Sequence, residues 1–321
     1  MHYFHAVPRA CVIASWNLED LVSLMLELAT PDTQNSEKLA PPPEVREVRE
    51  TVAERGSTLK GFLNLWNHRH LVALMVQRDF QGRYKGSLLG ALWPLLNPAG
   101  HMVIYTFLFS VVLQVRFNTN GGTGDFALYL MSGFLPWTAM SEAVSHATTK
   151  ILELPNLVKR CVFPLETLPL IVAISSFLTG AIAVALLIVF AAFRQGGVSG
   201  TVCLIPLILV PHFLFTCGLS WLFASLGVFV RDCRHFISLG LSAWMYMTPI
   251  LYPPERMPEH LKFLLYLNPM AGIITDYRHV ILENKMPNWE WYGIYTALSV
   301  VVCYLGFSFF YKTKHGFADI V

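Results

Sequence analysis

The residues of this sequence that could do acid–base chemistry are few and lie far apart. Glu142 stands inside an apolar stretch, and Glu255, Glu259, Asp276 and Glu283 lie in a segment nearer the C-terminal end. An integral membrane enzyme usually needs several carboxylates, or an acid and a base, close to one cleft. The spacing of these five residues pairs none of them convincingly, so the sequence favours a protein that is not an enzyme.

The sequence motifs typical of nucleotide and metal chemistry are also missing. The sequence contains no G-x-x-x-x-G-K-[ST], the loop that cradles phosphates and supplies a lysine, so the chain cannot hydrolyse ATP alone. The cysteines show no CxxC or His-x-x-His spacing, and we expect isolated small apolar residues rather than a metal site or a disulfide framework. They are Cys11, Cys161, Cys203, Cys217, Cys233 and Cys303.

The composition is typical of a membrane protein. Of the 321 residues, 54% are hydrophobic and 14% are charged, whereas a soluble domain carries about 25% charged residues. The formal net charge is +2 and no basic stripe is present, which argues against nucleic acid as a partner. No basic segment precedes the first apolar residues, so we expect no cleaved signal peptide.

Six apolar stretches predict an all-α protein with six transmembrane helices. Buried helices of a soluble protein do not reach this length and number, and the last four stretches lack Asp, Glu, Lys and Arg. Lys and Arg are more frequent in the segments that are inside if the N-terminus is cytoplasmic, so we expect both termini in the cytoplasm. The stretches lie near 99–115, 126–147, 168–193, 201–230, 236–252 and 291–311.

Residues 1–60 differ from the rest of the chain. The segment "ATPDTQNSEKLAPPPEVREVRETVAERGS" is polar and rich in proline and charge, which predicts a partly disordered cytoplasmic extension. Within it, residues 16–29 could form one amphipathic helix. We therefore divide the chain into this extension and a transmembrane domain at 61–321.

Residues 69–85 predict an amphipathic helix that lies in the membrane interface ahead of the first span. An apolar stripe at i, i+4 spacing runs along one side, although Asp79 and Arg83 intrude on it and Leu74 intrudes on the polar side. The stripe consists of Val72, Val76, Phe80 and Tyr84.

A turn should follow this helix. No charged residue occurs between Gly86 and Val115, and Pro94 and Pro98 interrupt the run. Proline donates no backbone hydrogen bond and disfavours helix in the residue before it. We therefore expect the chain to turn between Trp93 and Pro98 and then to cross the membrane upright.

Residues 253–289 are too apolar for a solvated loop. Two parts, "EHLKFLLYL" and "MAGIITDYRHVIL", each predict a helix, and Asn268-Pro269 between them fits an N-cap followed by a proline at the first helical position. We expect a re-entrant helical hairpin that enters the outer leaflet between spans five and six, with protein or water around its backbone.

Five motifs in the same order resemble the type-2 ABC exporter permeases that move polysaccharides or polyol phosphates. The resemblance covers about 61–321, and the order of the motifs is specific for this class of permease. The motifs are "RDFQGRYKGSLLGALWPLLNP" at 78–98, "FLPWTAMSEAV" at 134–144, "NLVKRCVFPLETLPL" at 156–170, "RDCRHFISLGLSAWMYMTPILYP" at 231–253 and "LNPMAGIITDYRHVIL" at 267–282.

The resemblance implies partners for this chain. In the family, two permeases pair with two copies of a separate P-loop ATPase, which binds the ATP and Mg, and no cofactor is expected on this chain. The interface helix and the loop after the second span contact that ATPase; the alternative for the cations is an anchor on anionic membrane lipids. The implied coupling residues are Arg78, Arg83, Lys85, Leu157, Lys159, Arg160, Phe163 and Pro164.

A path for a lipid-linked glycan should offer aromatic rings and neutral polar groups, because the cargo presents hydroxyls and flat C–H faces. Each aromatic could instead contact lipid or another helix. Glu142 has either a structural hydrogen-bonding role or a gating role at substrate entry. Asp276 and Arg278 on the outer hairpin either guide the exiting sugar or form a local ion pair. The path candidates are Tyr105, Phe109, Trp137, Glu142, Trp221, Phe229, Trp244 and Tyr246.

The resemblance thus implies the permease subunit of an ATP-driven exporter that moves lipid-linked polysaccharide, such as O-antigen, capsule or teichoic acid, across the bacterial cytoplasmic membrane. One alternative is a type-2 permease for a drug or a lipo-oligosaccharide. A different class of protein, a membrane glycan-polymerising enzyme, is the other. An ion channel would need rings of carbonyls or charges, and the sequence shows neither.

Overall fold

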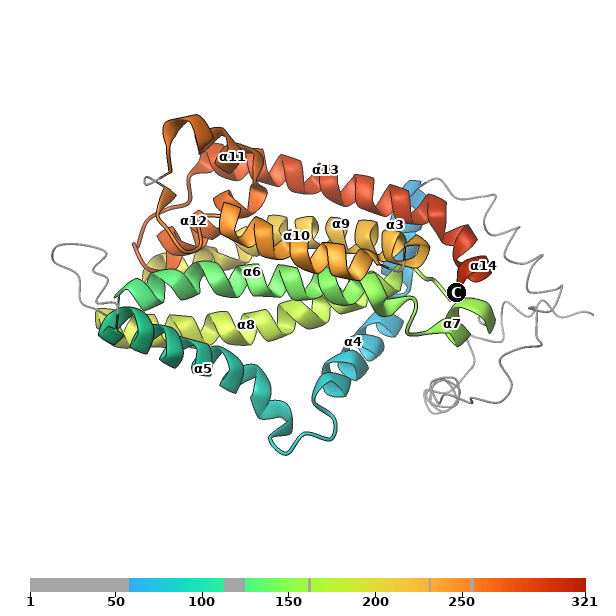
Figure 1. Cartoon of the computed structure of the whole chain (residues 1–321), viewed down its shortest axis with the longest axis horizontal. Coiled ribbons are helices and arrows are strands. Elements are labelled where there is room, and N and C mark those ends of the chain that lie inside the picture. The colour runs from blue at the N-terminus through green and yellow to red at the C-terminus, as the bar shows by residue number, and fades with distance from the viewer. Residues whose placement is uncertain (1–57, 113–124, 161–162, 231, 255–256) are drawn as a thin grey trace, which may run out of the picture.

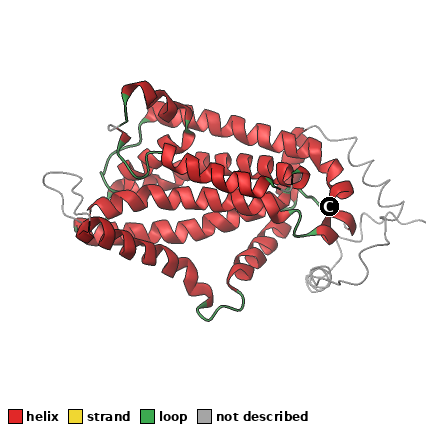
Figure 2. Ribbon diagram, viewed as in Figure 1, coloured by secondary structure: helices red, strands yellow, loops and turns green. Residues whose placement is uncertain are grey.

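The computed structural model describes residues 58–112, 125–160, 163–230, 232–254 and 257–321. In these ranges the chain forms helices and loops only (Figure 2), which confirms the all-α prediction. The extension at 1–57 and its amphipathic segment at 16–29 lie outside the described residues. The longer helices are α3 (Thr58–Asn67), α4 (Arg69–Tyr84), α5 (Trp93–Thr106), α6 (Asp125–Lys150), α8 (Thr167–Gln195), α9 (Ile205–Phe229), α10 (Cys233–Met247), α12 (Pro269–Ile281) and α13 (Trp289–Thr313).

Short helical segments join these elements. α5 continues as the π-helical segment Phe107–Val112, and 3₁₀ turns lie at Gly90–Leu92, Gly200–Leu204, Glu259–Leu261 and Lys314–Gly316. Three further helices are short, namely α7 (Pro155–Arg160), α11 (Lys262–Leu267) and α14 (Phe317–Ile320).

The long helices form one bundle in which α6, α8, α9 and α13 run side by side (Figure 1). α11 and α12 lie at one end of this bundle, whereas α7, α14 and the C-terminus lie at the opposite end. The segments that the sequence assigns to the two sides of a membrane therefore occupy opposite ends of the molecule.

Three of the described helices are long and apolar enough to cross a membrane. They are Thr167–Gln195, Gly200–Phe229 and Trp289–Gly316, where the last two include the adjoining 3₁₀ turns. They match the predicted stretches 168–193, 201–230 and 291–311. The stretches near 126–147 and 236–252 are also helical, as α6 and α10, and α5 with its π-helical extension covers the stretch near 99–115 up to Val112.

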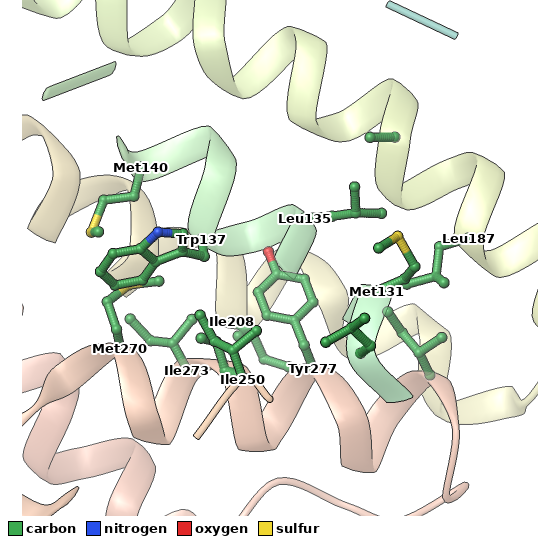
Figure 3. Packing of buried hydrophobic residues seen from close by; sticks show 14 of the residues in the cluster. Met131, Leu135, Trp137, Met140, Leu187, Ile208, Ile250, Met270, Ile273 and Tyr277 are labelled. Atoms are coloured by element: carbon green, nitrogen blue, oxygen red, sulfur yellow. The ribbon is translucent and has the colours of Figure 1, made fainter. Parts of the chain in front are cut away.

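One buried apolar cluster fills the half of the bundle next to α12. Figure 3 shows Trp137 and Met140 of α6 facing Met270, Ile273 and Tyr277 of α12. The side chain of each of the three α12 residues is at most 1% exposed. Packing of this extent places α12 in the protein core rather than in a surface loop.

A second cluster fills the half of the bundle nearer α7 and α14. Here Trp221 of α9 packs edge-on against Phe307 of α13, with ring centroids 5.0 Å apart, and the indole donates to the Glu166 carbonyl oxygen at 2.9 Å. α9 and α13 approach closely because Gly218 and Gly306 face each other, and a Cβ on either would overlap backbone atoms of the other helix.

The turn before the first predicted span lies earlier than we expected. The chain leaves α4 through Lys85–Leu89, where Gly86 adopts φ +82°, and α5 already begins at Trp93. Pro94 lies in the first turn of α5, where its missing N–H costs no helical hydrogen bond, and Pro98 lies inside the helix. The prediction of a break between Trp93 and Pro98 is therefore wrong.

The segment after α10 contains the two predicted helices, α11 and α12. Asn268 caps α12 as expected, because its side-chain oxygen accepts from the Met270 backbone N–H at 3.1 Å and Pro269 follows at the first helical position. The Asn268 amide also donates to the Thr248 hydroxyl at 2.9 Å, which links the start of α12 to the end of α10.

Candidate functional site

The coupling residues predicted on α4 point in two different directions. Arg78 and Lys85 are exposed, so an approaching protein could reach both. Arg83 is only half-buried and turns toward the bundle, where it meets Asp79, Glu142 of α6 and Ser176 of α8. Val72 and Val76 of the predicted stripe are buried at 7% exposure each. The Tyr84 side chain lies outside what the structure describes.

Asp79 is the centre of an ion cluster between α4 and α6. Its Oδ1 accepts from Lys150 Nζ at 2.7 Å, and its Oδ2 accepts from Arg83 Nε at 3.2 Å. Arg83 Nη2 donates to Ser176 Oγ at 3.2 Å, and Nη1 lies 3.9 Å from Glu142 Oε2. Burial alone would raise the pKa of Asp79, but the charges of Lys150 and Arg83 outweigh it and hold this pKa below its usual value.

The loop after α6, where coupling residues are predicted, packs on its inner side and is open on its outer side. Leu157 is buried in the second apolar cluster, which Phe163 also contacts, whereas Lys159 and Pro164 are partly exposed. The side chain of Arg160 lies outside what the structure describes. The loop contains α7, which packs against α14.

The C-terminal end of the chain holds the far side of this loop. Lys314 donates to Glu166 Oε2 at 3.1 Å and lies 3.9 Å from the centre of the Tyr311 ring. Because Glu166 is 4% exposed, this ion pair is largely shielded from solvent. The C-terminal end of the chain and the loop after α6 are therefore parts of one packed unit.

The predicted path residues differ widely in exposure. Tyr246 and Phe229 are exposed at 61% and 44%, while Tyr105 and Trp244 are half-buried. Trp137 and Trp221 are buried at 3% and 2%, and their indoles pack within the chain, as expected for helix-packing aromatics. The side chain of Phe109 lies outside what the structure describes.

Aromatic contacts attach α5 and α10 to α6. The Tyr105 ring packs edge-on against Phe134, with centroids 5.8 Å apart, and Trp244 packs edge-on against Trp137 at 5.5 Å. Between these contacts and α4, α6 keeps an open face that carries Glu142, whose side chain is 48% exposed.

Sequence reasoning missed a row of polar residues beside Glu142. Together with Glu142 they follow an i, i+3, i+4, i+7, i+8 pattern, which puts them on one face of α6, and each is exposed or half-buried. Thr138 donates to the Leu135 carbonyl and Ser141 to the Thr138 carbonyl, so these hydroxyls keep their acceptor lone pairs available. The signal was present as an i, i+3, i+4 polar pattern inside an apolar stretch. The row consists of Thr138, Ser141, Ser145 and His146.

Asp276 and Arg278 are both buried, at 1% and 2% exposure, and each has its own structural partners. Arg278 donates to the carbonyl oxygens of Pro249 at 2.6 Å, Ile250 at 2.8 Å and Tyr129 at 3.4 Å, and lies over the Tyr129 ring at 3.6 Å. It therefore connects α12 to the end of α10 and to α6.

Asp276 holds the opposite side of α12. Its Oδ2 accepts from the Tyr295 hydroxyl at 2.8 Å, and its Oδ1 accepts from the Asn288 backbone N–H at 3.2 Å. The guiding role of these two residues for an exiting sugar stays a prediction, and their contacts are those of residues that fix the position of α12.

The sequence profile of ABC-2 type transporters matches residues 70–282, which run from the second residue of α4 through α12. The chain belongs to the ABC-2 type transporter family. This membership and the three long apolar helices identify it as an integral membrane protein. The resemblance to type-2 ABC permeases is thereby confirmed.

Curated relatives of this ABC-2 chain cover most of its length. It is 30% identical over 259 residues to an O-antigen export system permease protein, RfbA, of Myxococcus xanthus, a match of 80% of this chain and 97% of that protein. An RfbA of Klebsiella pneumoniae is 30% identical over 253 residues, covering 78% and 95%. The polysialic acid transport protein KpsM of Escherichia coli is 19% identical over 246 residues, covering 76% and 93%.

Proposed function

We propose that this chain is the permease subunit of an ATP-driven exporter that moves a lipid-linked polysaccharide across the cytoplasmic membrane of a bacterium. The observation that carries the proposal is the similarity to O-antigen permeases, which extends over 97% of the length of one relative. The similarity is therefore not confined to a short common segment. It includes the helices that carry the coupling and path candidates described above.

The proposed topology has six spans formed by α5, α6, α8, α9, α10 and α13, with both termini in the cytoplasm. α4 lies in the inner interface and the α11–α12 hairpin in the outer leaflet. Support comes from the bundle, since α7 and α14 lie at the end opposite to α11 and α12. Exposed apolar side chains on α10 and α13, such as Leu239 and Leu305, suit contact with lipid or another subunit.

The proposed assembly contains two copies of the permease and two copies of a P-loop ATPase, which binds ATP and Mg. Contact with the ATPase would use the exposed cations Arg78 and Lys85 and the loop that carries Lys159, Arg160, Phe163 and Pro164. Their support is exposure on α4 and proximity of the loop to the C-terminal end of the bundle. Buried Leu157 would anchor the loop rather than touch the partner.

The proposed glycan path follows the open face of α6. Hydroxyl and imidazole groups would exchange hydrogen bonds with sugar hydroxyls, while half-buried Tyr105 and Trp244 would contact the flat C–H faces of sugar rings. A face with Glu142 and four neutral polar residues is costly against hydrocarbon, and a water-filled path removes that cost. Trp137 and Trp221 are buried, so they would pack within the bundle rather than contact the glycan.

The test is export in a strain that lacks its own polysaccharide permease. The full chain is expressed with a P-loop ATPase of a polysaccharide exporter from the same organism, and we expect co-purification of the two proteins and ATP-dependent appearance of glycan at the cell surface. Export of a drug or a short lipo-oligosaccharide without polysaccharide export would replace this function with the alternative cargo. Polymerisation of glycan by the purified chain without ATPase would overturn the transporter function altogether.

A further inference from the structure

The inward side of α4 is attached to the bundle by both apolar and ionic contacts. Val72 and Val76 pack into the second apolar cluster together with residues of α6 and α8. Further along α4, the two oxygens of Asp79 bind different cations, Lys150 at 2.7 Å and Arg83 at 3.2 Å. The Asp79 side chain is 10% exposed, so this cluster is shielded from most of the solvent.

The ion pair between Asp79 and Lys150 lies where two coupling segments meet. Lys150 is the last residue of α6, and α7 begins at Pro155 after a short connection. α4 carries Arg78 on its exposed side and is followed directly by exposed Lys85, and the α6–α7 corner leads into the loop that contains Lys159. One carboxylate thus joins both segments that face the proposed ATPase.

Ionic contacts add a property that the valines cannot provide. Apolar burial is non-directional, so Val72 and Val76 hold α4 against the bundle without fixing its position along the helix axis. Charged hydrogen bonds have defined geometry, and buried polar contacts can fix the register of packed helices. The bond from Arg83 to Ser176 of α8 gives this cluster a third helix to hold.

We propose that Asp79 is a positioning residue that locks α4 to the inner end of α6, so that α4 and the α6–α7 corner move as one body when the ATPase acts on them. This inference rests on the proposed function. It goes beyond that function because it assigns the mechanical link to an acidic residue that contacts neither ATP nor cargo.

The experiment compares Asp79→Asn with wild type in the complete complex of permease and ATPase. Asparagine keeps the shape but removes the charge that binds Lys150 and Arg83. We expect the variant to insert, to retain the ATPase and to hydrolyse ATP, while glycan exported per ATP hydrolysed falls by about tenfold or more. The exchange Asp79→Lys with Lys150→Asp restores the pair between positions 79 and 150 in reverse but leaves Arg83 without its carboxylate, so it should recover part of that ratio.

The matched control is Glu259→Gln, which removes one acid from the exposed ion pair with Lys262, where the Glu259 side chain is 95% exposed. It should export as wild type does. Export by Asp79→Asn at the wild-type rate would overturn the inference. The inference would also be overturned if export fell only in proportion to the amount of permease in the membrane, because Asp79 would then affect folding or insertion alone. If the wild-type chain neither binds the ATPase nor exports glycan, the proposed function itself is rejected.

Discussion

Replacing Gly306 by alanine tests how closely α9 and α13 must approach one another. A Cβ atom at Gly306 would lie 2.7 Å from the carbonyl carbon of Gly218 and closer still to its oxygen, whereas ordinary contact begins at 3.4 Å. The two helices would therefore have to separate by about 0.7 Å or more, because backbone atoms cannot rotate away as a side chain can.

The separation would act on the second apolar cluster. Trp221 and Phe307 pack across this same helix pair, so a shift of the backbones opens gaps around both rings. Overpacking of a core costs about 1–3 kcal/mol, and we expect the upper part of this range. At roughly 2–4 °C per kcal/mol, the melting temperature should fall by on the order of 5–10 °C.

The assay is thermal unfolding of the purified permease in detergent, with Gly293→Ala as the matched control. Gly293 lies on the same helix, and a Cβ there has nothing within 4 Å, so we expect no loss of stability. If Gly306→Ala melts at the wild-type temperature, the helices are not packed as closely as the two glycines indicate. Alanine favours the helix more than glycine does at both positions, so an equal loss in both variants would show that the close approach at Gly306 is not the cause.

Three further substitutions can be measured in the same unfolding assay. Asn268→Ala removes the cap of α12 and the bond to Thr248, and we expect a loss of about 1–2 kcal/mol, which an unchanged melting temperature would contradict. Arg278→Gln removes the guanidinium that donates to three carbonyl oxygens and should cost on the order of 3 kcal/mol. An unchanged melting temperature would show that these hydrogen bonds are not needed to hold α12. Trp221→Phe removes the bond to the Glu166 carbonyl and leaves a small cavity, for roughly 2 kcal/mol, whereas equal stability would show that neighbours refill the site.

Much of the helical layout could be predicted because the signals are local. The predicted interface helix at 69–85 corresponds to α4 at Arg69–Tyr84, and the predicted cap at Asn268-Pro269 has the expected hydrogen bond. Chain length without charge, helical spacing and capping chemistry depend on residues close in sequence. The turn before α5 was predicted too late in the chain because the prediction relied on Pro94 and Pro98. The turn instead uses Gly86, which adopts the left-handed conformation.

The orientation of individual side chains could not be predicted in the same way. Stretches that are apolar all round give no periodicity from which a buried face can be read. Trp137 and Tyr246 were therefore both predicted to line the glycan path, although Trp137 is 3% exposed and Tyr246 is 61% exposed. Only the packing of α12 and α10 against α6 separates them, and those contacts join residues far apart in the chain.

The surroundings of the charged residues Arg278 and Glu142 could not be predicted from the sequence either. Glu142 became a candidate because a charge in apolar surroundings is costly, and Arg278 because it lies on the predicted outer hairpin, but neither reason says which groups compensate the charge. Arg278 directs its guanidinium at three carbonyl oxygens and an aromatic ring, so the surrounding protein compensates its charge. Glu142 has a half-exposed carboxylate with Arg83 at 3.9 Å, beyond the reach of a direct hydrogen bond. A carboxylate with that much remaining acceptor capacity, beside a row of neutral polar residues, is therefore the better candidate for contact with a moving substrate.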